Sequence, residues 1–146
     1  MIACTIKAAL NTKLFDHVLV STDSEQIAEI AMEYGAEVPF LREKNQDHLS
    51  PVSLAIIASL EQAEIFWKKK FSVVTLLMPN CPLRSEKTII SCVKEFYESS
   101  NESLISCFKF GWANPWWAFK LNLDGSHQWI NEGIIETRSQ DLENLY

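Results

Sequence analysis

Two polar segments that follow apolar runs carry the residues best suited to bind a ligand. The first is Ser21-Thr22-Asp23, which ends the β-branched run at residues 15–21 and precedes a helical pattern that begins at Glu25. Hydroxyl groups and main-chain N–H groups at a helix start can bind an anion or a ribose, because the first N–H groups have no partner inside the helix. The same residues are also good helix caps. Both interpretations stay open on spacing alone.

The second segment is the sequence PNCPLR at residues 79–84, directly after the apolar run at residues 71–78. Its two prolines restrict the backbone and present Asn80 and Cys81, while Arg84 is available to pair with a carboxylate or a phosphate. The alternative is a structural turn in which Arg84 hydrogen-bonds main-chain carbonyl groups. We interpret Cys81 as a packing residue and not a nucleophile, because no histidine is close to it in sequence.

Aromatic and donor-rich segments follow in the last third of the chain. Trp112 and the sequence NPWW at residues 114–117 could stack on a sugar or a base, meet a second subunit, or pack in a core. Arg138 and Gln140 combine a guanidinium with an amide, which suits the binding of a carboxylate. A surface turn is the alternative for this segment.

Charge and residue spacing exclude several other classes of protein. The formal net charge of −6 disfavours a nucleic-acid partner, and the basic run at residues 68–70 fits the negative end of a helix dipole better than a phosphate patch. The four cysteines form no C-x-x-C pair, the three histidines have no metal-site spacing, and no D-x-D pair occurs. Without an apolar run of about 20 residues, we expect a cytoplasmic protein with reduced thiols and no membrane partner.

The periodicity of apolar residues predicts an alternation of helices and strands. Gly35 fits the left-handed position that ends a helix, and Ser50-Pro51 fits an N-cap followed by proline at the first helical position. The run at residues 71–78 has the near-continuous apolarity of a strand buried on both faces of a parallel sheet. The predicted helices are residues 1–10, 25–34, 51–69 and 85–98, and the predicted extended segments are residues 15–21, 36–41, 71–78 and 103–110.

This alternation favours one α/β domain over residues 1–146. Strands that alternate with helices form right-handed crossovers, which gives a doubly wound, mostly parallel sheet with helices on both faces. Such sheets bind ligands beyond the carboxyl ends of their strands. The segments at residues 21–23 and 79–84 leave the predicted strands at that edge, so we expect the binding site there.

Four blocks of sequence, in a fixed order over nearly the whole chain, resemble the acylneuraminate cytidylyltransferase family, which makes CMP-activated nonulosonic acids such as sialic acid. The blocks are IKAALNTKLFDHVLVSTDSEQIAEIAMEYGAEVPFLR, LLMPNCPLRS, NPWWA and RSQDL. The first is the most specific, LLMPNCPLR is similar to the family's LLQPTSPLR loop, and RSQDL is similar to the segment that binds the sugar acid. The resemblance implies a Rossmann-like fold of the nucleotide-diphospho-sugar transferase type, here incomplete.

The resemblance also implies a reaction and a set of binding residues. The anomeric hydroxyl of the sugar acid attacks the α-phosphate of CTP and releases pyrophosphate, usually with magnesium as cofactor and in a homodimer. Asn80 and Arg84 fall in the loop on the sugar side, and Arg138 and Gln140 would hold the sugar carboxylate. The residues similar to family positions at the nucleotide are Ser21, Asp23, Arg42, Ser50 and Ser53.

Departures from the family pattern lead to two further expectations. Met78, Asn80 and Cys81 replace the usual Gln, Thr and Ser, and Glu143 replaces a proline, so the particular sugar stays open. The family's basic, glycine-containing phosphate loop and its metal-binding aspartates have no match here, and the four glycines are isolated. We therefore expect no catalytic or metal-binding residue in this chain, and weak or absent turnover in this form.

Two other functions remain as alternatives. The first is a non-catalytic remnant that binds a sugar acid or dimerises through residues 112–117. The second is a cytidylyltransferase for an eight-carbon sugar acid, against which the PLR loop and the RSQDL segment argue.

Overall fold

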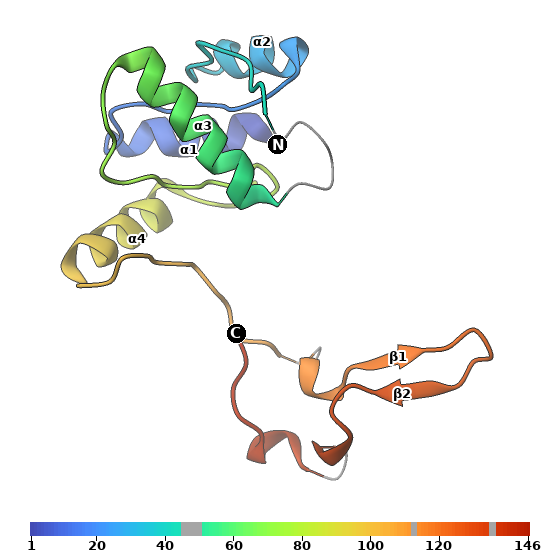
Figure 1. Ribbon diagram of the computed structural model, residues 1–146. Coiled ribbons are helices and arrows are strands. Elements are labelled where there is room, and N and C mark those ends of the chain that lie inside the picture. Colours follow the sequence, from blue (N-terminus) through green and yellow to red (C-terminus); the bar gives the residue numbers. More distant parts are fainter. Residues whose placement is uncertain (45–50, 112–113, 135–136) are drawn as a thin grey trace. The chain divides into compact units, whose positions relative to one another are not determined.

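The computed structural model describes residues 1–44, 51–111, 114–134 and 137–146, which fall into two compact units. The first unit is Met1–Asn101 and the second is Glu102–Tyr146 (Figure 1). The expectation of one domain over residues 1–146 stays a prediction.

Four α-helices make up most of the first unit, and they confirm the predicted helices to within about two residues at each end. Serine caps two of them: Ser24 Oγ accepts a hydrogen bond from the Ile27 amide at 3.4 Å, and Ser85 Oγ accepts one from the Thr88 amide at 3.3 Å. The helices are α1 (Ile2–Thr12), α2 (Glu25–Glu33), α3 (Val52–Trp67) and α4 (Glu86–Glu98).

Gly35 ends α2 in the way that the sequence predicted. Its φ of +90° lies in the left-handed region, and a Cβ atom there would lie 3.1 Å from Leu10 Cδ1 of α1. Both the backbone conformation and the close approach of α1 therefore favour glycine.

The core of the first unit is small and is built where α1 and α2 meet two extended segments. Ile6 of α1 and Ala31 of α2 are buried together with Ala36. The half-buried side chains that pack against this cluster are Ile2, Val20 and Val38. Two of the three buried residues are alanines, so this cluster removes little apolar area from water. Many larger apolar side chains of the unit stay exposed.

The extended segments at residues 15–21 and 36–41 lie side by side and are joined by an isolated parallel bridge. Leu19 pairs with Glu37. The Val20 amide donates to the Glu37 carbonyl at 3.0 Å, and the Glu37 amide donates to the Val18 carbonyl at 2.8 Å. This bridge fixes the direction of the backbone that leads to Ser21.

The predicted doubly wound parallel sheet is not formed by the described residues. The segments at residues 71–78 and 103–110 are extended but have no strand assignment, and Val74 and Leu76 are about half exposed, at 51% and 49%. A strand needs a hydrogen-bonded neighbour, which an apolar run does not specify.

The second unit contains a short antiparallel hairpin that the sequence did not predict. Strands β1 (Phe119–Leu121) and β2 (His127–Trp129) pair Phe119 with Trp129. Gly125, at φ +83°, and Asp124 form the turn, and Asp124 Oδ1 accepts from the Ser126 amide at 2.9 Å. The short 3₁₀ helices of this unit are η1 (Pro115–Trp117), η2 (Glu132–Ile134) and η3 (Ser139–Asp141).

No helix in the described part of the chain has both the length and the apolar character needed to cross a membrane.

Candidate functional site

Three of the predicted nucleotide-binding residues come together in the first unit. Arg42 Nη1 lies 3.3 Å from the main-chain oxygen of Ser21 and 3.5 Å from its Oγ atom. Arg42 Nη2 lies 4.0 Å from Asp23 Oδ1. The Arg42 amide also donates to the Thr22 carbonyl at 2.7 Å. Residues about twenty positions apart in sequence thus form one polar site, to which Arg42 brings donors and Asp23 brings acceptors.

The turn before α2 holds this site in shape. Thr22 is buried, and its Oγ1 atom accepts from the Ser24 amide at 3.1 Å. Ser24 in turn provides the side-chain cap of α2. Ser24 caps α2, so the side chains of Ser21 and Asp23 are not used as caps and lie beside Arg42. The structure therefore assigns the cap of α2 to Ser24, and ligand binding by Ser21, Thr22 and Asp23 stays a prediction.

Helix α3 contributes a residue that sequence reasoning missed. Ser59 is buried, with its Oγ atom 2.5 Å from Ser21 Oγ and 2.6 Å from the Ala55 carbonyl. One turn further on, Gln62 donates to the Leu41 carbonyl at 3.1 Å. A single hydroxyl in the apolar stretch LAIIASL was the available signal, since a buried polar group needs a partner.

Ser53, a fourth predicted nucleotide contact, makes none of the hydrogen bonds described above. Ser53 is exposed in the first turn of α3. Ser50 lies outside the described residues. The site is therefore defined by Ser21, Asp23 and Arg42, with Ser59 behind Ser21.

The loop at residues 79–84 forms the turn that the sequence predicted. Arg84 Nη1 donates to the Met78 carbonyl at 3.1 Å, and the Arg84 amide donates to the Cys81 carbonyl at 3.2 Å. This is the geometry of the structural-turn alternative. Asn80 is exposed, with its Oδ1 atom 3.6 Å from Cys81 Sγ. Sugar binding by Asn80 and Arg84 stays a prediction.

Arg138 and Gln140 take different positions in the second unit. Arg138 Nε lies 2.8 Å from Asp141 Oδ2, so its charge is paired within its own turn. Gln140 lines a hollow of about 280 Å³, whose wall also includes Lys109 and Asn114. Lys109 is a cation that the sequence did not single out. The predicted carboxylate site at Arg138 and Gln140 stays a prediction.

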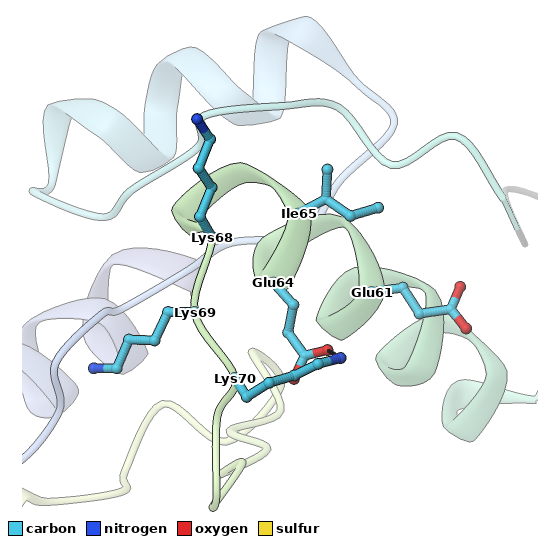
Figure 2. Close-up of a pocket in the computed structure, with 6 residues that line it drawn as sticks. All are labelled: Glu61, Glu64, Ile65, Lys68, Lys69 and Lys70. Atoms are coloured by element: carbon cyan, nitrogen blue, oxygen red, sulfur yellow. Dashed lines mark hydrogen bonds and ion pairs between the residues drawn. The ribbon is translucent and has the colours of Figure 1, made fainter.

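A larger hollow of about 460 Å³ lies beside the end of α3 (Figure 2). In Figure 2, Lys70 reaches back to Glu64, with which it forms an ion pair, while Lys68 and Lys69 extend in different directions. Lys69 Nζ lies 2.8 Å from Asp16 Oδ2. The hollow is lined by Glu61, Glu64, Ile65, Lys68, Lys69 and Lys70. Ion pairs with Asp16 and Glu64 already neutralise Lys69 and Lys70, so most of the positive charge around this hollow is satisfied within the protein.

The same ion pairs lower two carboxyl pKa values. The hydrogen bond and charge of Lys69 hold the pKa of Asp16 below its ordinary value. The hydrogen bond from Lys70 does the same for the pKa of Glu64. These carboxylates are stabilised in their charged form and are poor candidates for a proton-transferring group at neutral pH.

The described residues contain no group of three or more His, Cys, Asp or Glu side chains placed to hold a metal ion.

Comparison with known proteins identifies the family. Residues 1–109 match the family described as cytidylyltransferase. This match covers most of the chain and includes Ser21, Asp23, Arg42 and Ser59. The chain belongs to the cytidylyltransferase family.

Individual relatives give the same family. Over its whole length the chain is 41% identical to the post-translational flagellin modification protein B of Campylobacter coli and 29% identical to a pseudaminic acid cytidylyltransferase of Campylobacter jejuni. Over 86% of its length it is 33% identical to a CMP-N,N'-diacetyllegionaminic acid synthase of Legionella pneumophila, covering 53% of that protein. The chain spans 62% of the length of each of the two Campylobacter relatives.

Proposed function

We propose that the protein transfers CMP from CTP to a nonulosonic acid and releases pyrophosphate. The observation that carries this proposal is the approach of Arg42 to Ser21 and Asp23 within the family-matched part of the chain. The site combines a guanidinium that only donates hydrogen bonds with a carboxylate that only accepts them. Such a pair suits the mixed donors and acceptors of a cytidine.

The names of the relatives support the class of acceptor sugar. They include a pseudaminic acid cytidylyltransferase and a diacetyllegionaminic acid synthase. Both acids are nine-carbon sugars with a carboxylate next to the anomeric carbon, which favours a nonulosonic acid over an eight-carbon sugar acid. The departures at Asn80 and Cys81 leave the particular acid undecided among pseudaminic, legionaminic and sialic acid.

The sugar-side residues, the cofactor, the assembly and the location belong to the same proposal. Asn80, Arg84, Arg138 and Gln140 are the residues proposed to contact the sugar acid. Magnesium is proposed to accompany the triphosphate, since it binds nucleotide phosphates with few protein ligands. The described residues offer no cluster for it, so we assign no step to a protein-bound metal. A homodimer in the cytoplasm is the proposed form.

Pyrophosphate release tests the proposal directly. The protein is mixed with CTP, magnesium and, in separate reactions, pseudaminic, legionaminic, sialic and an eight-carbon sugar acid. Because weak turnover is expected of this form, we expect at most slow release, which requires CTP together with one of the nine-carbon acids and which falls further in Arg42→Ala. Turnover with the eight-carbon acid alone would contradict the proposed acceptor. Calorimetric binding of a nine-carbon acid with neither CTP binding nor turnover would favour the non-catalytic alternative.

A further inference from the structure

The hollow of about 280 Å³ in the second unit contains a cation that no carboxylate of the protein neutralises. Lys109 lines this hollow, and among the residues that the structure describes it forms no ion pair. The charge of Arg138, in contrast, is paired, because its Nε atom lies 2.8 Å from Asp141 Oδ2. Lys109 is therefore the cation that is available to an anionic ligand in this hollow.

Hydrogen bonds hold the wall of the hollow in place. The Phe110 amide donates to the Leu145 carbonyl at 2.9 Å. The indole Nε1 of Trp116 donates to the Glu143 carbonyl at 3.0 Å. The segment that carries Lys109 is thereby fastened to the segment that carries Glu143, although the two are far apart in sequence. A ligand would meet a wall that is already formed.

The other groups of the wall suit a sugar. Asn114 Oδ1 accepts from the Trp116 amide at 3.0 Å, so the side-chain N–H groups of Asn114 are left to donate to a ligand. Gln140 adds a second amide, and the half-buried Trp117 adds an aromatic surface. The volume of about 280 Å³ lies close to the lower end of the range for small-molecule sites, about 300–1,000 Å³. A hollow of this size suits one sugar better than a nucleoside triphosphate.

We propose that Lys109 binds the carboxylate of the nonulosonic acid and that Glu143 orients the acid in the same hollow. This inference rests on the proposed function. Glu143 also lines the hollow and, within the described ranges, forms no ion pair. Its carboxylate repels the carboxylate of the ligand and accepts hydrogen bonds from the ligand's hydroxyl and amide groups. The acid group is therefore directed to Lys109.

The ratio of the affinities for the acid and for its methyl ester tests this inference. The ester lacks the negative charge and keeps the other groups of the sugar, so a merely structural defect would weaken both ligands together. Sialic, legionaminic and pseudaminic acid are titrated into isotope-labelled protein with and without CTP, in the absence of magnesium, and NMR shifts give each affinity. The methyl ester of the acid that binds most tightly follows. We expect the unmodified protein to bind this acid roughly three- to tenfold more tightly than its ester.

Four variants assign the ratio to particular side chains. Lys109→Met removes the charge, so the ratio should fall below about twofold, whereas Lys109→Arg keeps the charge and should keep the ratio. Glu143→Gln removes the repulsion and should raise the ratio about twofold. Lys120→Met is the matched control, because it removes a charge from the exposed strand β1 of the same unit, and should leave the ratio unchanged. The amide spectrum of each variant reports whether the fold is kept.

The failure of this inference and the failure of the proposed function give different results. The absence of saturable shifts with all three acids, with and without CTP, would overturn the proposed function and this inference with it. Equal affinities for acid and ester in the unmodified protein, or an unchanged ratio in Lys109→Met, would overturn the role of Lys109 alone. Loss of the ratio in Arg138→Met but not in Lys109→Met would return the carboxylate to Arg138. A ratio that stays the same or falls in Glu143→Gln would overturn the orienting role of Glu143.

Discussion

Arg42 and Ser21 are joined at two points, since Arg42 Nη1 lies 3.3 Å from the Ser21 carbonyl oxygen and 3.5 Å from Ser21 Oγ. The planar guanidinium thereby holds the turn before α2 against the segment that leads to α3. This relationship links the stability of the turn to the proposed nucleotide site, because the same side chain also approaches Asp23.

Substitution of Arg42 should weaken CTP binding, and alanine should weaken it at least as much as lysine. Arg42→Ala removes charged hydrogen bonds worth about 1.5–3 kcal/mol, so we expect a loss of roughly ten- to a hundredfold in affinity. Arg42→Lys keeps the positive charge but not the planar set of N–H donors, so its affinity for CTP should fall about tenfold. Lys44→Ala is the matched control, because Lys44 pairs with Glu61 on the surface. Equal losses in the control and in Arg42→Ala by calorimetry would contradict the role of Arg42.

Two threonines of α1 should respond oppositely to the same substitution. Thr5 Oγ1 is buried and, within the part of the chain that the structure describes, has no hydrogen-bond partner. Thr12 Oγ1 donates to the Ala9 carbonyl at 2.7 Å and accepts from the Leu14 amide at 3.3 Å. We expect Thr5→Val to raise the free energy of unfolding by up to about 1 kcal/mol and Thr12→Val to lower it by about 1 kcal/mol. Urea unfolding measures both, and a loss of stability in Thr5→Val would show that its hydroxyl is satisfied.

The cap of α4 gives a second stability test. Ser85 Oγ accepts from the Thr88 amide at 3.3 Å, so Ser85→Ala should lower the free energy of unfolding by about 1 kcal/mol. Ser91→Ala, on the exposed surface of the same helix, should leave it unchanged or slightly raised, because alanine has the higher helix propensity. Circular dichroism during urea unfolding compares the two variants. Equal effects would mean that the cap contributes nothing.

The ion pair of Asp16 and Lys69 predicts a loss of stability in acid. Lys69 lowers the pKa of Asp16 from its ordinary value of 3.8. Because the folded pKa lies below the unfolded one, the contribution to stability is complete above pH 3.8 and is lost as the pH falls through the folded pKa. Carboxyl titration by NMR should show the low pKa in the unmodified protein and a rise toward the ordinary value in Lys69→Met.

Lys87→Met is the control for this titration, because it removes the same charge from an exposed position on α4. A rise in the Asp16 pKa of equal size in this control would indicate a general charge effect and not the pair.

The helices were predictable because their signals are local. The four helices lie within about two residues of their predicted bounds, and Gly35 follows the C-cap Tyr34 of α2 with the left-handed φ that its sequence pattern indicated. The strands were not predictable to the same extent, because a strand depends on a neighbour distant in sequence. The apolar run at residues 71–78 specifies a buried environment but not the chain that covers it.

The candidate site was predictable in part. The resemblance placed Ser21, Asp23 and Arg42 at the nucleotide, and the structure brings these three together. Ser59 was missed because its partner Ser21 is 38 residues away, and a lone hydroxyl in an apolar stretch indicates that a partner is needed but not which residue provides it. His17, whose spacing to the other histidines marked no metal site, is half-buried, and its ring stacks on Trp67 with a centroid distance of 4.0 Å.

Mapping the CTP site by NMR tests the central claim most directly. CTP is added stepwise to isotope-labelled protein while the main-chain amide signals are recorded, with ATP as the comparison. We predict saturable shifts at Ser21, Thr22, Asp23, Arg42 and Ser59 that CTP produces and ATP does not. Saturation by CTP that leaves these five amides unchanged, or the absence of any saturable shift, would contradict the account.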